Sequence, residues 1–216
     1  MENHILVGAF QEGARFYQPQ RPEAHDFLTR HLTPDQLSGR NVVVPNCGRS
    51  VDMIYLAQHA ARVTGTGCTP MQIEQFQEEN CLYMEFDGAA WRFDSLSLSP
   101  VPLCNLPDAQ LGTVDIVYDR SAMISTAPDM RGDYLSRIDR LTRPGGRIYL
   151  MTVEFSTQRS EGPYSISAAE VETLFGDRYT VKHLEEAHCP AHLLARAHNL
   201  ADLREHFFCL TRKPRA

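Results

Sequence analysis

The fold follows from one stretch, Asn41-Val42-Val43-Val44-Pro45-Asn46-Cys47-Gly48-Arg49-Ser50. Its continuous apolar run, Val42 to Val44, predicts a strand that is buried on both faces, as in a parallel sheet covered by helices. A helix is expected directly after it, at residues 50–60, because its apolar side chains recur at helical spacing. A buried strand, a loop with one glycine and a helix are typical of the first unit of a doubly wound α/β fold.

Strand-like and helix-like segments alternate along the rest of the chain, which indicates a parallel sheet with helical crossovers. Further strands are expected at 62–66, 91–98, 113–118, 147–155, 179–184 and 205–211, and further helices at 23–32, 70–79, 129–141 and 168–175. We therefore predict a doubly wound, mostly parallel, seven-stranded sheet with helices on both faces. Residues 1–38 are interpreted as an N-terminal arm that covers the site, and residues 39–216 as the domain itself.

The amino-acid composition argues against two classes of binding partner, nucleic acids and membranes. The chain has 21 Lys and Arg against 27 Asp and Glu, a net charge of −6, which argues against a nucleic-acid backbone as ligand. Its uncharged stretches are too short to cross a bilayer, and the N-terminus shows no basic-then-apolar signal pattern. We expect a cytoplasmic monomer that acts on a small molecule.

Histidines gather around Cys189, at positions 188, 192, 198 and 206. His188 and His192 have the spacing of one helix face, but Pro190 between them disfavours a regular helix. No metal site is expected from this pattern.

Ligands of open α/β sheets bind beyond the carboxyl ends of the strands, near the point where strand order reverses. Three loops are therefore candidates: residues 45–50, 65–69 and 118–121. The first has neither the GxGxxG pattern of dinucleotide sites nor the glycines and lysine of a P-loop. One glycine allows one close backbone approach, which suits a nucleoside without phosphates such as S-adenosylmethionine, although a lone glycine is also an ordinary turn.

Several motifs together resemble the thiopurine S-methyltransferase family, which includes bacterial thiol and selenium methyltransferases. Residues 44–53 resemble the family's V-P-L-C-G-K-S-x-D-M, and residues 118–123 its Y-D-R-A-A-M. Arg131 and Tyr134 follow at the family's spacing. Shorter matches are Phe16-Tyr17-Gln18, Gly162-Pro163, Glu170, Leu174 and Phe175. The resemblance implies a class I, Rossmann-like methyltransferase fold with S-adenosylmethionine as cofactor.

The resemblance also implies roles for individual residues. Cofactor contacts are expected at Phe16, Asn46, Cys47, Gly48, Gly67, Cys68, Pro102 and Leu103, substrate contacts at Phe10, Phe16 and Arg120, and catalytic roles for Asp119 and Arg120. Three positions depart from the family. Gly67 stands where an acidic residue holds the ribose, Asn105 replaces a second acidic residue, and Pro102, beside the adenine position, has no backbone N–H.

The implied function is methyl transfer to a small thiol, selenol or similar soft nucleophile. A thiolate is largely available near neutral pH, so alignment matters more than a strong base. Asp119 is also readable as a helix cap, Arg120 as a salt-bridge partner and Cys47 as a packed small residue. The three departures keep two other hypotheses open: a binding or scaffold protein that has lost catalysis, and transfer of another group from the sulfonium.

Overall fold

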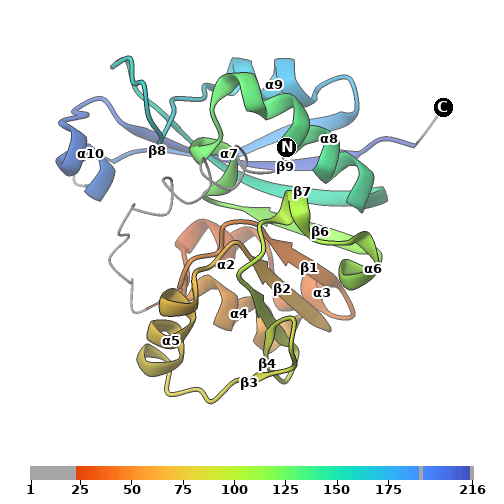
Figure 1. Ribbon diagram of the computed structural model, residues 1–216. Coiled ribbons are helices and arrows are strands. Elements are labelled where there is room, and N and C mark those ends of the chain that lie inside the picture. Colours follow the sequence, from red (N-terminus) through yellow and green to blue (C-terminus); the bar gives the residue numbers. More distant parts are fainter. Residues whose placement is uncertain (1–22, 190–191, 215–216) are drawn as a thin grey trace, which may run out of the picture.

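The computed structural model describes residues 23–189 and 192–214, which form a sheet flanked by two layers of helices (Figure 1). Nine strands of this part of the chain pair in the order β3-β4-β5-β2-β1-β6-β7-β9-β8. Their bounds are β1 Asn41–Val44, β2 Arg62–Thr66, β3 Glu85–Phe86, β4 Trp91–Phe93, β5 Leu96–Ser99, β6 Val114–Asp119, β7 Thr142–Glu154, β8 Tyr179–His188 and β9 Arg204–Arg212.

The five central strands, β5, β2, β1, β6 and β7, run parallel. The chain winds outward from β1 through β2 to β5 and then returns to pair β6 with the other side of β1. Strand order therefore reverses between β1 and β6, which is the position where the ligand was expected to bind. The doubly wound α/β prediction is confirmed.

The expected number of seven strands is wrong, since the described residues contain nine. The segment predicted as one strand, residues 91–98, is divided at Asp94, whose φ of 50° turns the chain back on itself. β4 consequently runs antiparallel to β5, and the two-residue β3 pairs with β4. Both edges of the sheet are antiparallel, because β9 also runs against β7 and β8.

Two buried clusters, one on each face of the sheet, fix the helical layers. Val43 contributes to one cluster, and Val42 and Val44 to the other, as the apolar run predicted. One layer holds α2 (Asp26–His31), α3 (Pro34–Leu37), α4 (Asp52–His59) and α5 (Pro70–Glu79). The opposite layer holds η1 (Leu103–Asn105), α6 (Asp108–Leu111), α7 (Ala122–Ser125), η2 (Pro128–Met130), α8 (Arg131–Leu141), α9 (Ala168–Phe175) and α10 (Leu193–His198).

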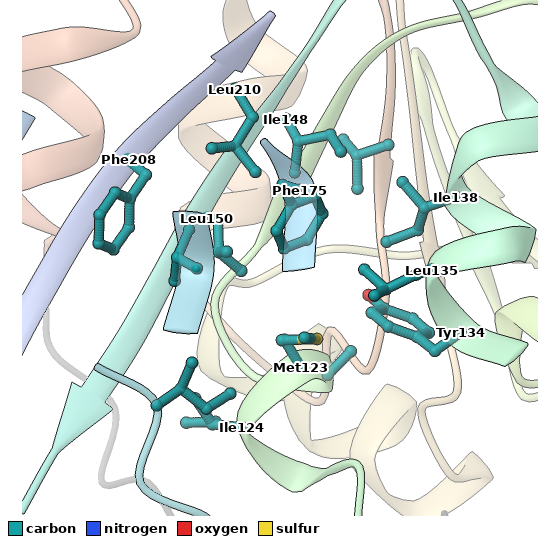
Figure 2. Close-up of a cluster of buried hydrophobic side chains, with 14 of the residues drawn as sticks. Met123, Ile124, Tyr134, Leu135, Ile138, Ile148, Leu150, Phe175, Phe208 and Leu210 are labelled. Atoms are coloured by element: carbon teal, nitrogen blue, oxygen red, sulfur yellow. The ribbon is translucent and has the colours of Figure 1, made fainter. Parts of the chain in front are cut away.

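The helical spacing of the apolar residues in α8 determines which of its side chains are buried. Tyr134 and Ile138 are four residues apart, share one face of α8 and are at most 2% exposed. They face the cluster that contains Leu150 and Phe208 of the sheet (Figure 2). Burying such side chains contributes roughly 1.5–3 kcal/mol each, which anchors α7 and α8 beside the carboxyl end of β6.

In the described part of the predicted N-terminal arm, α2 lies within the helix expected at 23–32, which is confirmed, and the shorter α3 follows it. Phe27, Leu28 and Leu37 of this segment lie in the α4 and α5 cluster. None of the helices in the described residues is long and apolar enough to cross a bilayer.

Candidate active site

The loop after β1 is shaped by two residues with left-handed backbone, Asn46 (φ 47°) and Gly48 (φ 53°). Between them, the Cys47 N–H donates to the Thr66 carbonyl at 3.1 Å, which ties this loop to the end of β2. The loop therefore turns sharply and presents partly exposed backbone at the carboxyl edge of the sheet.

The loop after β2 packs directly against it. Gly67 has a φ of 71°, and its N–H donates to the Val101 carbonyl at 3.1 Å. A Cβ at position 67 would lie 2.8 Å from Asn46 Oδ1, closer than real Cβ contacts allow. The Asn46 amide thus occupies the space next to Gly67 into which a side chain would project.

Cys47 and Cys68 contribute backbone rather than thiols to this edge. Both side chains are buried, and the Cys68 thiol donates to the Ser99 carbonyl at 3.3 Å. A hydrogen bond with Cys68, together with burial, raises the pKa of the Cys47 thiol well above its usual value. A thiol with a raised pKa is a poor nucleophile, which supports the interpretation of Cys47 as a packed small residue.

The segment after β5 carries the other departures from the family. Pro102 precedes η1, and its carbonyl accepts from the Asn105 N–H at 2.9 Å. Leu103 is 4% exposed and packs into the core, whereas the Asn105 residue is exposed.

Asp119, at the end of β6, is 1% exposed and caps α7. Its carboxylate accepts from the N–H groups of Ala122 at 2.8 Å and Met123 at 3.2 Å, and from Tyr134 Oη at 2.6 Å. Burial raises the pKa of Asp119 to about 6, against these hydrogen bonds, which act to lower it. Asp119 therefore positions the residues that follow β6.

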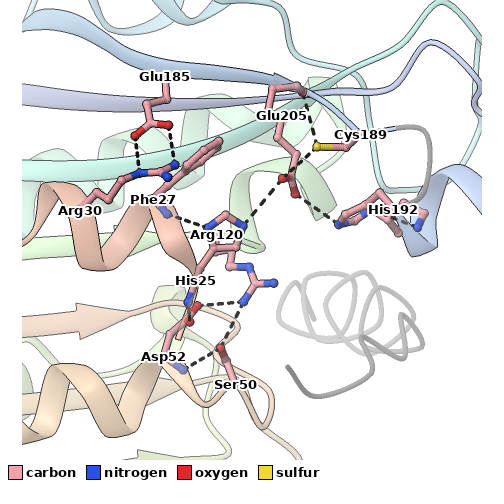
Figure 3. Close-up of polar contacts among 12 residues, drawn as sticks. His25, Phe27, Arg30, Ser50, Asp52, Arg120, Glu185, Cys189, His192 and Glu205 are labelled. Atoms are coloured by element: carbon pink, nitrogen blue, oxygen red, sulfur yellow. Dashed lines mark hydrogen bonds and ion pairs between the residues drawn. The ribbon is translucent and has the colours of Figure 1, made fainter. Parts of the chain in front are cut away.

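Arg120 points across the carboxyl edge toward the loop after β1 (Figure 3). Its Nη1 donates to Asp52 Oδ2 at 2.8 Å and lies 3.5 Å from Ser50 Oγ. Asp52 also accepts from Tyr118 Oη at 2.9 Å and from the His25 N–H at 2.8 Å. Although burial alone would raise it, the charge of Arg120 helps to hold the pKa of Asp52 below its ordinary value.

A second polar cluster, which sequence reasoning missed, surrounds Glu205 of β9 (Figure 3). His192 Nε2 lies 3.2 Å and His25 Nε2 3.8 Å from the Glu205 carboxylate, and Cys189 Sγ lies 3.5 Å from it. Burial alone would raise the pKa of Glu205, but the facing imidazoles of His192 and His25 hold it well below its usual range.

Both imidazoles of the Glu205 cluster are helix caps. His25 Nδ1 accepts from the Phe27 N–H of α2, and His192 Nδ1 accepts from the Leu194 N–H of α10, each at 3.2 Å. An accepting Nδ1 leaves Nε2 as the protonated nitrogen, aimed at the carboxylate. Histidine is not a favoured N-cap residue, which is why sequence reasoning did not identify these two caps. The available signal was a histidine directly before each of two helical segments.

A cavity of about 850 Å³ lies beyond the end of β7, and none of the residues of the loops after β1 and β2 lines it. Its lining includes Arg131, Glu154, Tyr164 and Arg204. Phe10 and Phe16, expected near the substrate, lie outside the described residues.

A family model described as thiopurine S-methyltransferase matches residues 15–213. The chain belongs to this family. Its relatives include the thiopurine S-methyltransferase of Pseudomonas fluorescens (strain SBW25), 32% identical over 170 residues that cover 76% of this chain and 78% of the relative. The enzyme of the same name from Nitrosospira multiformis is 32% identical over 182 residues, which cover 81% and 80%.

Solved structures share the class I fold of this thiopurine S-methyltransferase family member. The 1,6-didemethyltoxoflavin-N1-methyltransferase of Burkholderia thailandensis, with bound S-adenosylhomocysteine, matches with a TM-score of 0.64 and 18% identity over 97% of this chain and 86% of that chain. Magnesium protoporphyrin IX methyltransferase from Synechocystis PCC 6803, with bound S-adenosylmethionine, gives 0.61 and 18% over 96% and 81%. The chain is an S-adenosylmethionine-dependent methyltransferase.

The loops after β1 and β2 fit this cofactor. Left-handed backbone at Asn46, Gly48 and Gly67 brings main chain to the carboxyl edge without a covering Cβ at the two glycines. The Asn46 amide beside Gly67 offers both a donor and an acceptor, which is what a pair of ribose hydroxyls needs. These residues would hold the nucleoside, with Asn46 in place of the family's acidic side chain.

Proposed function

We propose that the protein methylates a small thiol, selenol or similar soft nucleophile, and that Arg120 binds and orients the acceptor. The supporting observation is the placement of Arg120, which reaches from the end of β6 to Ser50 and Asp52 after β1. Its guanidinium thus lies at the same sheet edge as the cofactor loops. S-adenosylmethionine, when bound, supplies an already activated methyl group.

The chain's own residues then have three tasks. Asp52 fixes the guanidinium of Arg120, whose side chain remains 14% exposed. The guanidinium pairs with an anionic acceptor and aligns it, which is worth more than a base when the nucleophile is a thiolate. Asp119 stabilises the turn between β6 and α7 and thereby positions the backbone of Arg120.

A panel of small thiols and selenols tests the proposal, with S-adenosylmethionine as methyl donor. For the best anionic acceptor, Arg120→Ala should lower kcat/KM about 10- to 100-fold, because a charge-assisted hydrogen bond contributes roughly 1.5–3 kcal/mol. Arg120→Lys should fall in between, since lysine keeps the charge but loses the planar fork. Arg140→Ala, at an exposed arginine on α8, is the matched control.

Cofactor affinity and a melting curve are measured on the same preparations. The proposal fails if Arg120→Ala turns over the best acceptor normally, or if its loss of activity only follows loss of fold.

A binding or scaffold protein without catalysis is the second candidate, favoured by Gly67, Pro102 and the exposed Asn105. Cofactor binding with no turnover of any acceptor in the panel would support it. We also propose that the protein is a cytoplasmic monomer and that residues 1–38 cover the site.

A further inference from the structure

The edge hairpin of the sheet contains an irregularity with a chemical consequence. β8 and β9 pair antiparallel, with His183 opposite Phe208 but Glu185 opposite Phe207, so Leu184 is an extra residue in β8. In a regular strand, residues 183 and 186 would point to opposite faces, because side chains alternate. The bulge reverses that alternation and places His183 and Glu186 on the same face.

His206 of β9 completes a group of three on this face. It is directly opposite Glu186, and its Nδ1 lies 3.2 Å from His183 Nε2 and 3.8 Å from Glu186 Oε2. The three potential ligand atoms lie within 4.8 Å of one another. We refer to His183, Glu186 and His206 as the hairpin triad.

The separation of the two imidazole nitrogens matches metal coordination. Two nitrogens that each bind zinc at about 2.05 Å with tetrahedral geometry are about 3.3 Å apart. The observed 3.2 Å between the two nitrogens is close to this separation. Glu186 Oε2 is 3.8 Å from His206 Nδ1 and the three ligand atoms lie up to 4.8 Å apart, so the exposed carboxylate would have to move by about 1 Å toward the two rings.

Neighbouring side chains orient each member of the triad. His206 Nε2 lies 3.0 Å from Glu154 Oε2, so this nitrogen carries the proton and the lone pair of Nδ1 faces His183. The His183 ring stacks on Phe208, with centroids 4.6 Å apart. Arg204 pairs with Glu186 Oε1 and leaves Oε2 for the triad.

The Glu205 cluster, by contrast, has the wrong protonation for a metal. His25 Nδ1 and His192 Nδ1 accept backbone N–H groups, so each Nε2 carries a proton and has no lone pair to offer. The carboxylate–histidine arrangement that typically supports a metal ligand is found at His206.

We propose that the hairpin triad binds a divalent metal ion of the zinc class, through two imidazoles and one carboxylate. This set of ligands suits zinc and leaves a fourth position for water or a ligand. His183 and Glu186 are exposed, so an ion can enter from solvent. Glu154 and Arg204, which contact the triad, also line the cavity beyond β7. His183 lies outside the group of histidines around Cys189, in which Pro190 argued against a metal site, so the sequence pattern did not indicate this set of ligands.

Zinc chloride is titrated by calorimetry into the full chain after removal of bound metal with a chelator. We expect one ion per chain and at least 10-fold weaker binding in His183→Ala and in His206→Ala. Glu154→Gln should weaken binding about 10-fold or more through the orientation of His206. His188→Ala, at an exposed histidine on the same strand, is the matched control and should bind as wild type.

Two further readouts identify the ligands. Coordination through His183 Nε2 requires the proton of that nitrogen to move to Nδ1 of the same ring, so the imidazole signals of His183 in NMR spectra should change on zinc binding. Substitution by Co²⁺ should give visible absorption typical of tetrahedral nitrogen and oxygen ligation.

Three results would overturn the proposal: no stoichiometric zinc binding by the wild type, unchanged binding in His183→Ala, or cobalt–thiolate absorption that places the ion at a cysteine. Because His206 is buried, its variant can fail to fold, and the exposed His183 then decides the outcome.

Discussion

The side chain of Asn46 lies where the family's acidic residue would project. Its Oδ1 is 2.8 Å from the position of a Cβ on Gly67, whose φ of 71° belongs to the region that favours glycine. The absence of a carboxylate at position 67 is therefore coupled to the loop after β1. A carboxylate cannot be restored there by a single substitution without strain.

Gly67→Ala should lower the free energy of unfolding by about 1–3 kcal/mol, because alanine resists a left-handed backbone and meets Asn46. Gly132→Ala is the control: this glycine lies in α8 with open space around its Cβ position, and alanine favours helices. Urea unfolding compares the two variants. Equal effects would show that Gly67 is not conformationally constrained.

From the sequence, Asp119 and Arg120 were expected to have catalytic roles, with a helix cap and a salt-bridge partner as the alternatives. The structure shows that Asp119 is a buried cap of α7 and that Arg120 pairs with Asp52. Asp119 contacts residues that are close to it in sequence, and Arg120 and Asp52 each lie in one of the two main motifs that resemble the family. The Glu205 cluster joins His25, His192 and Glu205, and long-range contacts of this kind leave no local pattern to find.

At the level of elements, α2 and α10 start at opposite ends of the chain yet converge on one carboxylate. Each begins with a capping histidine whose Nε2 faces Glu205 of β9. One buried side chain thus joins two helices to the sheet, next to the strand end that carries Arg120. Neither helix is longer than six residues, so the contact of its capping histidine with Glu205 contributes much of the stability of its N-terminus.

Glu205→Gln should lower the free energy of unfolding at pH 7 by about 1–3 kcal/mol, since hydrogen bonds to a charged group are lost. The pKa of Glu205 is lowered by folding, so its contribution is present above the ordinary carboxyl pKa of 4.5 and is lost as pH falls below it. The difference between wild type and variant should therefore shrink below about pH 4.5. Urea titrations between pH 3.5 and 7 would measure it. A difference that stays constant with pH would mean that the carboxylate charge is not what stabilises the cluster.

Across the whole molecule, the central parallel strands were the predictable part of the fold. Buried on both faces, they are marked by continuous apolar runs such as Val42 to Val44. The antiparallel edges were less predictable: the turn at Asp94 carries no glycine, and β3 has two residues. Strand ends also differed, because β7 begins at Thr142 and includes the Pro144-Gly145-Gly146 segment that was expected to be a turn.

Binding of S-adenosylhomocysteine should stabilise the whole molecule, because the cofactor loops meet only in the native state. At a ligand concentration 100 times Kd, the gain is about 2.7 kcal/mol, measurable as a rise in Tm. Arg120→Ala should show the same rise, since Arg120 is assigned to the acceptor. No rise at millimolar ligand in the wild type would contradict the fit of loops 46–48 and 67 to the cofactor.

The extra residue in β8 determines to which face of the sheet each following side chain points. Leu184 and Glu185 both face the α2 layer, where Glu185 pairs with Arg30, and Glu186 returns to the opposite face. Deleting Leu184 would remove the bulge and leave His183, Glu185 and Glu186 opposite Phe208, Phe207 and His206. His183 and Glu186 would then be second neighbours in a regular strand and would keep the same face. Among related chains, a one-residue gap at this position is therefore compatible with the hairpin triad, whereas an inserted residue would move Glu186 to the other face of the sheet.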